Sequence, residues 1–451
     1  MSALLKIITD VDCDLYVDFE YKEHLTVGKM SKLEIQRGTY ILDFKIDNVT
    51  IHSEEYYIPS NNEEYIYKFQ FIENNKSRII LYDAGEKVFH GCLTLALRYN
   101  LPLVSATRRV DIHEDAFDQP VVYHICTEQG KGIIIFKDSI TSIGDRAFWG
   151  CTNLEKIVIP DGVVSIGRSA FSGCTKVAFY GKFATSDHNC IIVNDVLLAC
   201  SPKDLNKYVV PDGIKVIGES AFYECKNLNT IELPSTINAI EKSAFEGCKG
   251  LKSIVIPNEV KNIGESAFCN CYHLENIGLP DAISSLKDNL FKGCYNLNSI
   301  YIPESVEYIA ESAFSGCSKV LFYGKYASED HRCLVIDGLL HTFTSYGLVS
   351  YTIPFGVETI RDYQFQCSSL RTIKVPESVR IIGPNAFCFT DNLIRIIMTS
   401  KTPPKLYGRI HFNHKGWISV PRESVDAYKH ADGWKNYAWN IRESLSIDRY
   451  M

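Results

Sequence analysis

Apolar residues recur along most of this chain with a fixed period. The unit reads Ile-Gly-x-x-Ala-Phe-x-x-Cys-x-x-Leu-x-x-Ile-x-Ile-Pro and first occurs complete over residues 143–160. Within runs, its phenylalanine recurs every 22 or 23 residues, at Phe148, Phe171, Phe222, Phe245, Phe268, Phe291, Phe314, Phe365 and Phe387. A period of this length is typical of a solenoid, in which each repeat forms one turn and stacks on the next.

Each unit contains one short strand whose side chains alternate between the interior and solvent. Ile157 and Ile159 fall two residues apart, so we expect both to point inward. Pro160 lacks a backbone N–H and should end the strand, after which Val164 and Ile166 should return to the core. One turn cannot bury these groups alone, so the turns must stack.

Two intervals of 51 residues interrupt the period, and each contains a variant coil. The variants lie near 179–211 and 322–354 and repeat one another at an offset of 143 residues, which indicates a tandem duplication. Counting them, the sequence predicts a β-rich leucine-rich-repeat array of roughly a dozen coils over residues 107–400. The motif around Phe117 is a degenerate first copy.

Half of the sixteen cysteines occupy one repeated position, which argues against a secreted disulfide framework. Buried cysteine behaves as a small apolar side chain, so we predict a ladder of reduced, buried thiols. Neighbouring parallel strands are close enough for disulfides, so oxidised pairs remain an alternative. The ladder positions are Cys151, Cys174, Cys225, Cys248, Cys271, Cys294, Cys317 and Cys367.

The two ends of the chain lack the period. Residues 1–106 alternate as short strands over 15–19, 31–35 and 40–44, which predicts a small all-β module of five or six strands with a connector that includes a helix over 89–99. This module could supply a second contact surface, a dimerisation element or only a cap. Residues 401–451 are predicted to cap the other end, with a strand at Trp417–Val420 followed by a helix and a turn.

Charge and hydropathy exclude some partners. The net charge is −7 without a basic stripe, which argues against nucleic acid. No run of 18 apolar residues occurs, so no membrane span is expected. The first residues lack the pattern of a signal peptide, which favours a cytoplasmic protein; a surface or secreted protein is the alternative if a leader was removed.

The repeat unit over residues 110–400 resembles the BspA-like leucine-rich-repeat family of bacteria. The segment with Pro403-Pro404, Trp417 and Trp434 resembles that family's C-terminal piece, and residues 1–80 are similar to PEGA-type β-sandwich modules. The resemblance implies a solenoid that binds other molecules without catalysis. Some secreted members are adhesins.

No catalytic or cofactor motif is found. Gly-Glu-Ser-Ala-Phe at Gly218 and Gly264 matches a nucleophile elbow for three residues only and recurs as repeat scaffold. Asp-His-x-Cys occurs twice, at 187–190 and 330–333, and its side chains can bind zinc. The copies lie about six coils apart, so we favour a hairpin with a capping aspartate and a buried cysteine at each. Neither a metal nor a cofactor is predicted.

The outward face of the main sheet is the remaining candidate site. Its side chains are small, polar and of mixed charge, with one aromatic anchor that could serve as a hot spot. We predict a scaffold that binds a protein or peptide through this face, the N-terminal module or both. The alternatives are an adhesin for host protein or glycan and an enzyme with an unrecognised site. The partner-binding candidates are Lys156, Thr230, Glu232, Asn276, Tyr301 and Lys374.

Overall fold

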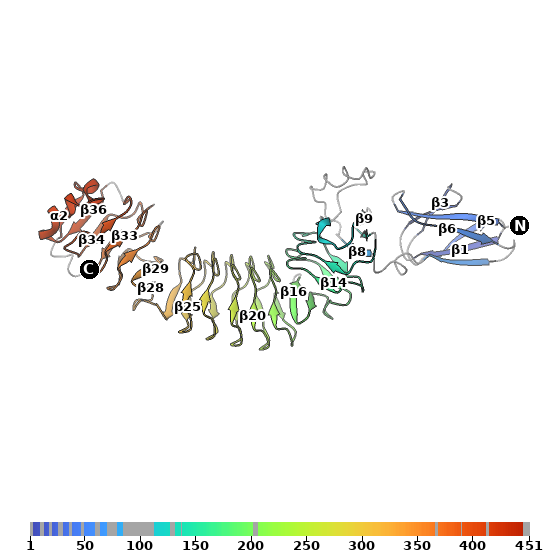
Figure 1. Ribbon diagram of the computed structural model, residues 1–451, viewed down its shortest axis with the longest axis horizontal. Helices are drawn as coiled ribbons and strands as arrows, with labels where there is room; N and C mark the ends of the chain where they lie inside the picture. Colours follow the sequence, from blue (N-terminus) through green and yellow to red (C-terminus); the bar gives the residue numbers. More distant parts are fainter. Residues whose placement is uncertain are drawn as a thin grey trace. The chain divides into compact units, whose positions relative to one another are not determined.

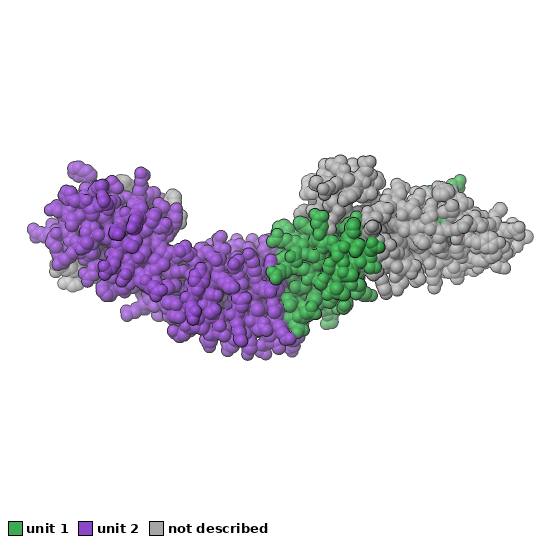
Figure 2. Space-filling view, in the orientation of Figure 1, with its two compact units in different colours: residues 1–203 green, residues 204–451 purple. Residues whose placement is uncertain are grey.

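Strands make up nearly all of the regular structure (Figure 1). The computed structural model describes residues 3–9, 13–17, 20–25, 30–35, 38–46, 49–58, 64–69, 79–83, 112–126, 131–136, 138–201, 206–365, 369–388, 390–411 and 415–444. Within them it shows a β-solenoid of about 13 turns with little helix. The chain divides into unit 1, Met1–Lys203, and unit 2, Asp204–Met451, coloured separately in Figure 2.

Unit 1 begins with seven described strands, against the five or six expected. They form two sheets, ordered β4-β1-β7 and β3-β2-β5-β6. Leu15, Leu25 and Leu42 are buried on the second sheet. The helix expected over 89–99 lies outside the described residues. The strands are β1 (Ala3–Thr9), β2 (Cys13–Val17), β3 (Glu20–Leu25), β4 (Met30–Ile35), β5 (Gly38–Ile46), β6 (Val49–Ile58) and β7 (Glu64–Phe69).

The next strand, β8 (Ile79–Asp83), belongs to the solenoid sheet. It pairs antiparallel with both β10 (Lys131–Phe136) and β12 (Lys156–Val158). The sheet is completed by β9 (Val121–Cys126) and β14 (Ala178–Tyr180), while β11 (Ser142–Ile143) pairs with β13 (Ser165–Ile166). The region 1–106, expected to precede the solenoid, thus contributes one strand to its first sheet.

A column of phenylalanine rings forms the core of the stacked turns. In unit 1, Phe148 stacks on Phe171 at 5.1 Å, and Phe117 meets Phe148 edge-on at 5.9 Å, as expected for a degenerate first copy. In unit 2, successive rings from Phe222 to Phe314 lie 5.1–5.8 Å apart. These distances exceed the spacing of neighbouring strands only slightly, so each ring covers the next.

The inward alternation is confirmed at Ile157 and Ile159, which are fully buried, but the prediction for Val164 is wrong. Val164 is 63% exposed, while Val163 beside it is buried. The turn after Pro160 is closed by a bond from the Val163 N–H to the Pro160 carbonyl at 3.1 Å. This tighter turn brings the chain back to the core one residue earlier than the sequence pattern suggested.

The buried thiol ladder is confirmed at the seven positions that the structure describes; Cys367 lies outside them. Each thiol of Cys174, Cys248, Cys271, Cys294 and Cys317 donates to the phenylalanine carbonyl 26 residues earlier, at 3.0–3.2 Å. The cysteine therefore fills a small apolar space and also bonds a buried carbonyl of the preceding turn.

Most regular turns also have left-handed backbone positions that the sequence pattern did not predict. One directly precedes the conserved Ala-Phe step, as at Ser243 (φ 54°) and Ser266 (φ 56°). The other precedes the ladder cysteine, as at Gly247 (φ 75°) and Gly293 (φ 76°). Glycine adopts this conformation without strain, which explains why Gly-Cys recurs in the repeat.

Unit 2 builds its main sheet from one strand per turn. All of its neighbours are parallel, in the order β17-β19-β21-β23-β25-β27. The strands are β17 (Lys207–Val209), β19 (Thr230–Glu232), β21 (Ser253–Val255), β23 (Asn276–Gly278), β25 (Ser299–Ile302) and β27 (Leu321–Gly324). Two-residue strands stack beside it: β18 (Val216–Ile217), β20 (Ala239–Ile240), β22 (Asn262–Ile263), β24 (Ser285–Leu286) and β26 (Tyr308–Ile309).

Each variant coil contains an antiparallel hairpin. The first joins β15 (Cys190–Val193) to β16 (Val196–Cys200), and the second joins β28 (Cys333–Ile336) to β29 (Leu339–Phe343). Both two-residue turns have positive φ at both positions, Asn194-Asp195 and Asp337-Gly338, as in type I′ hairpin turns.

Near the C-terminal end, a strand and two buried aromatic residues pack onto the last turns. The strand Trp417–Val420 (β36) pairs with β34 (Arg395–Met398) and with β37 (Ile441–Glu443). Tyr428 and Trp434 are fully buried and donate hydrogen bonds to the carbonyls of Ser400 (3.1 Å) and Pro404 (2.7 Å). The remaining elements are β30 (Ser350–Thr352), β31 (Thr359–Ile360), β32 (Thr372–Val375), β33 (Ile381–Ile382), β35 (Lys405–Leu406) and α2 (Val425–His430), with 3-10 turns at Glu114–Ala116, Arg422–Ser424 and Trp434–Tyr437.

The column of stacked rings predicts that removing a buried phenylalanine destabilises the chain much more than removing an exposed one. Phe245→Ala should lower the free energy of unfolding of unit 2 by about 3–5 kcal/mol, because it leaves a cavity between two stacked rings. Phe355→Ala is the matched control, since Phe355 is 80% exposed, and should change stability by less than about 0.5 kcal/mol. Denaturant titrations of both variants check this, and equal losses would contradict a continuous core.

The thiol ladder predicts a loss of stability at alkaline pH. Burial raises the pKa of Cys225 and Cys317 from 9.0 to about 12. Below pH 9 both folded and unfolded thiols keep their protons, and above it only the unfolded thiols lose them. Stability should therefore fall as pH rises from 9 toward 12, by up to ~1.4 kcal/mol per pH unit and thiol.

Other groups also titrate in this range, so the test is a comparison of variants. The slope of unfolding free energy against pH should be shallower in Cys225→Ala than in the unmodified chain. An unchanged slope would contradict the prediction.

Candidate functional site

An open groove of about 550 Å³ lies on the outward face of the main sheet of unit 2. Strands β21, β23, β25 and β27 form it, each with alternate side chains directed away from the core. Val255 is 81% exposed, Tyr301 56% and Tyr323 37%. Large apolar side chains this exposed, gathered on one solvent-facing sheet, indicate a contact surface.

Gly278 creates the depth of the groove. It pairs with Val255 on β21, and its own strand pairs with β25, which carries Tyr301. A Cβ added to Gly278 would meet no atom within 4 Å. The missing side chain therefore leaves a notch one strand wide between a valine and a tyrosine.

Polar side chains form a second column beside the notch. Ser253, Asn276 and Ser299 occupy matching positions on three successive strands. Hydroxyl and amide groups both donate and accept hydrogen bonds, so this column can bond the main chain or polar side chains of a ligand. The groove thus joins an apolar notch to a polar strip, as is usual for binding sites.

The structure brings only part of the predicted set together. Asn276 and Tyr301 line the groove, and Thr230 lies on β19, one strand beyond it. Glu232, also on β19, forms an exposed ion pair with Lys207 at 2.5 Å. Lys156 lies in unit 1, with its Nζ 4.4 Å from the centre of the Tyr180 ring.

Lys374, the last predicted residue, lies on β32 in a different sheet. Many outward positions of that sheet are covered by neighbouring side chains. On the neighbouring strands, Arg395 and Ser419 are buried and joined by a hydrogen bond of 3.1 Å. Arg395 and Arg442 also lie over the Trp417 ring, at 5.5 and 5.7 Å from its centre. This part of the face is packed rather than grooved.

Tyr323 was not predicted because it lies in the variant motif Phe-Tyr-Gly-Lys, outside the regular repeat. Its distance of 22 residues from Tyr301 was an available signal, being one turn of the repeat. Val255 and Gly278 also occupy outward positions of the strand pattern, but the notch at Gly278 exists only because larger side chains lie on the strands to either side.

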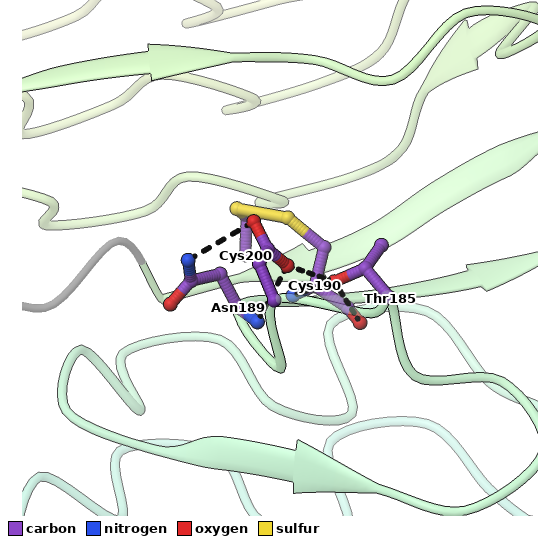
Figure 3. The surroundings of a disulfide bond; sticks show 5 residues. Thr185, Asn189, Cys190 and Cys200 are labelled. Carbon is purple, nitrogen blue, oxygen red and sulfur yellow. Dashed lines mark hydrogen bonds between the residues drawn. A yellow bond between two sulfur atoms is a disulfide. The ribbon is translucent and has the colours of Figure 1, made fainter.

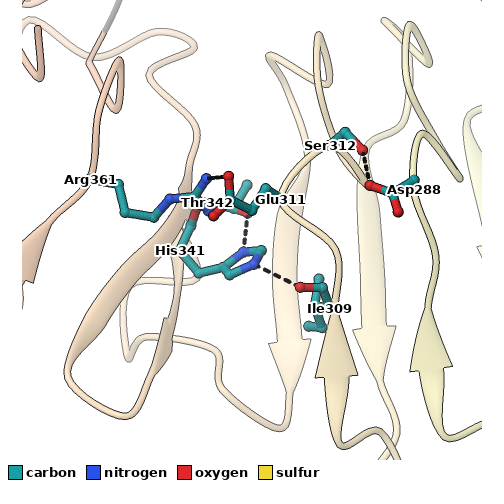
Figure 4. Close-up of polar contacts among 7 residues, drawn as sticks. All are labelled: Asp288, Ile309, Glu311, Ser312, His341, Thr342 and Arg361. Carbon is teal, nitrogen blue, oxygen red and sulfur yellow. Dashed lines mark hydrogen bonds and ion pairs between the residues drawn. The ribbon is translucent and has the colours of Figure 1, made fainter.

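A buried histidine, His341, lies on β29 of the second hairpin. His341 bonds the Ile309 carbonyl and the Thr342 hydroxyl, both at 2.9 Å, and Arg361 pairs with Glu311 nearby (Figure 4). Burial, followed by the Arg361 charge, lowers the pKa of His341, which favours the neutral ring. Its ring nitrogens are engaged in these structural hydrogen bonds.

The two Asp-His-x-Cys motifs form hairpin caps as predicted. Asp187 accepts bonds from the Thr185 hydroxyl (2.5 Å) and the Asn189 N–H (3.1 Å), and His188 stacks on Tyr180. Among the described residues, no group of three His, Cys, Asp or Glu side chains is arranged to hold a metal ion. No helix in that part of the chain has the length and hydropathy to cross a bilayer.

The sequence profile of the BspA type leucine rich repeat region matches residues 127–186, 198–321 and 340–406 in six copies, more than half of the chain. Among solved structures, a leucine-rich repeat protein from Bacteroides ovatus is 24% identical, covering 67% of this chain and 70% of that one, with a TM-score of 0.37.

Two further solved structures match. The leucine rich repeat protein of T. pallidum is 25% identical, covering 47% of this chain and 86% of that one at a TM-score of 0.29. A leucine rich cell surface protein from Faecalibacterium prausnitzii is 21% identical, covering 69% of this chain and 78% of that one at a TM-score of 0.29. No curated protein matches the chain.

Adding a side chain at Gly278 and at Gly264 should change the free energy of unfolding in opposite directions. Gly278→Val should raise the free energy of unfolding by about 0.5–1 kcal/mol, because a strand residue with open space replaces a flexible glycine. Gly264→Ala should lower it by about 1–3 kcal/mol or more, because its Cβ would lie 2.4 Å from the Lys242 backbone nitrogen. Thermal unfolding of both variants provides the measurement. Destabilisation by Gly278→Val would mean that the notch is required for folding.

Proposed function

Because the chain belongs to the BspA type leucine-rich-repeat family, we propose that it binds a protein or peptide partner through the groove over Gly278. Repeat proteins of this family are typically non-catalytic. The observation that carries the proposal is the notch itself, an unfilled position between exposed Val255 and Tyr301 on an otherwise regular sheet.

The notch suits one apolar side chain of the partner. A leucine or phenylalanine inserted there would contact Val255, Tyr301 and the exposed backbone of β23. Removing such a side chain from water contributes about 1.5–3 kcal/mol. That magnitude is typical of a binding hot spot surrounded by weaker contacts.

The polar column would fix the orientation of the partner. Ser253, Asn276 and Ser299 can bond an extended main chain laid beside the notch. Such bonds contribute modestly to affinity but penalise a misplaced ligand, because buried polar groups would be left unpaired. Affinity would come from the notch and specificity from the column.

The test is a photocrosslinking capture. A benzophenone amino acid at Tyr301 should crosslink a protein from native lysate, identified by mass spectrometry. The same probe at Tyr308, 58% exposed on β26, is the matched control and should not crosslink that protein.

Gly278→Val should abolish the crosslink, because it fills the notch while the chain stays folded. Recovery of the same partner at an unchanged yield from Gly278→Val would overturn the proposal. Deleting residues 1–70, upstream of β8, tests the N-terminal module. Loss of the partner on this deletion, with the groove intact, would assign binding to the module instead.

A further inference from the structure

The two variant hairpins share one polar framework, position by position. In the first, the Cys190 N–H donates to the Thr185 hydroxyl at 3.0 Å; in the second, the Cys333 N–H donates to the Ser328 hydroxyl at 3.1 Å. His188 and His331 stack on Tyr180 and Tyr323, both at 4.2 Å. The duplicated hairpins can therefore serve as internal controls for each other.

They differ where the second strand ends. In the first hairpin, Cys190 faces Cys200 across the strand pair, with their Cα atoms 4.2 Å apart and their sulfurs bonded (Figure 3). In the second, Cys333 faces Phe343. The Phe343 ring packs on Tyr351 at 4.4 Å and on Phe365 at 5.0 Å.

The repeat cysteines are held differently. The ladder thiols of unit 2 from Cys248 to Cys317 donate to carbonyls of the preceding turn, and burial raises their pKa. Ionised thiolate is the species that exchanges with disulfides, so these thiols are poor participants. Among the described residues, Cys190 and Cys200 are the one bonded pair.

We propose that Cys190 and Cys200 form a thiol–disulfide couple, in which oxidation links β16 covalently to β15. In the second hairpin, the packing of the Phe343 ring on Tyr351 and Phe365 holds β29 in place instead. The first hairpin is then held firmly only when oxidised, whereas the second is held in any redox state. This inference is independent of the groove and of its partner.

The exchange is balanced with a small-molecule disulfide such as glutathione disulfide. One cysteine thiolate attacks that disulfide, forming a mixed disulfide and releasing one glutathione thiol. The second cysteine then attacks the protein sulfur of the mixed disulfide and releases the second glutathione. The two protein thiols lose two electrons and two protons, which reduce the acceptor to two thiols.

Both sulfurs belong to buried residues, so exchange requires the hairpin to open locally. The couple should therefore respond slowly in the folded chain and faster under mild denaturant. This separates it from exposed thiols, which react without any opening.

The test uses the full chain equilibrated in buffers of reduced and oxidised glutathione. After acid quenching, denaturation and alkylation, peptide mapping should show the Cys190–Cys200 crosslink in the oxidised sample, with the ten other cysteines that the structure describes alkylated. Hydrogen exchange of the peptide spanning 190–200 should be at least about tenfold slower in the oxidised sample than in the reduced one.

Four variants make the outcome specific. Cys200→Phe should give a redox-independent first hairpin, and Phe343→Cys should create a second couple with Cys333. Cys269→Ser, a buried cysteine outside the hairpins, is the matched control and should respond like the unmodified chain. Cys200→Ser, the smallest change, should exchange at the reduced rate in either buffer.

Alkylation of both Cys190 and Cys200 in the oxidised sample, or equal exchange of 190–200 in both buffers, would overturn the proposal. The couple also makes location measurable. Alkylation of the chain directly in cells reports which form is present there. The cytoplasmic location proposed from the sequence implies the dithiol form, and an exported chain implies the disulfide.

Discussion

The stacking distance between turns constrains every other feature of this structure. Adjacent turns approach closely enough for ring centres to lie 5.1–5.8 Å apart from Phe222 to Phe314. At that distance each buried group must have a counterpart of similar size directly above it. Gly264 illustrates the limit, because the backbone of the preceding turn occupies the space a Cβ would need. The conserved positions of the repeat are those that meet this requirement.

The same constraint leaves the outward face free to vary. Outward side chains have neighbours only to their sides, so the stack does not dictate their size or charge. Val255, Gly278 and Tyr301 can therefore differ between adjacent turns without disturbing the core. Two glycines of unit 2 show the contrast: Gly264 is required by packing, whereas Gly278 leaves space that packing does not need. A binding site can arise on such a face at little cost in stability.

The variant coils show how the solenoid tolerates a departure from its period. Each hairpin replaces the Ala-Phe motif and must secure its second strand in another way. A ring at Phe343 does so in one copy, and a sulfur bond at Cys200 does so in the other. Both solutions retain the same capping carboxylate and histidine–tyrosine stack, so the duplicated framework is robust to changes at this one position.

The sequence alone determined the repeat, most of its inward residues, the thiol ladder, the hairpin caps and the strand at Trp417–Val420. These follow from periodic burial and local turn chemistry, which a linear pattern records directly. It misplaced the return to the core at Val164, because the choice between Val163 and Val164 depends on how tightly the turn closes. The pairing of β8 with β12, the groove over Gly278 and the bond between Cys190 and Cys200 were decided by tertiary structure. Each depends on which residues of neighbouring strands come to lie side by side, and that juxtaposition exists only once the turns have stacked.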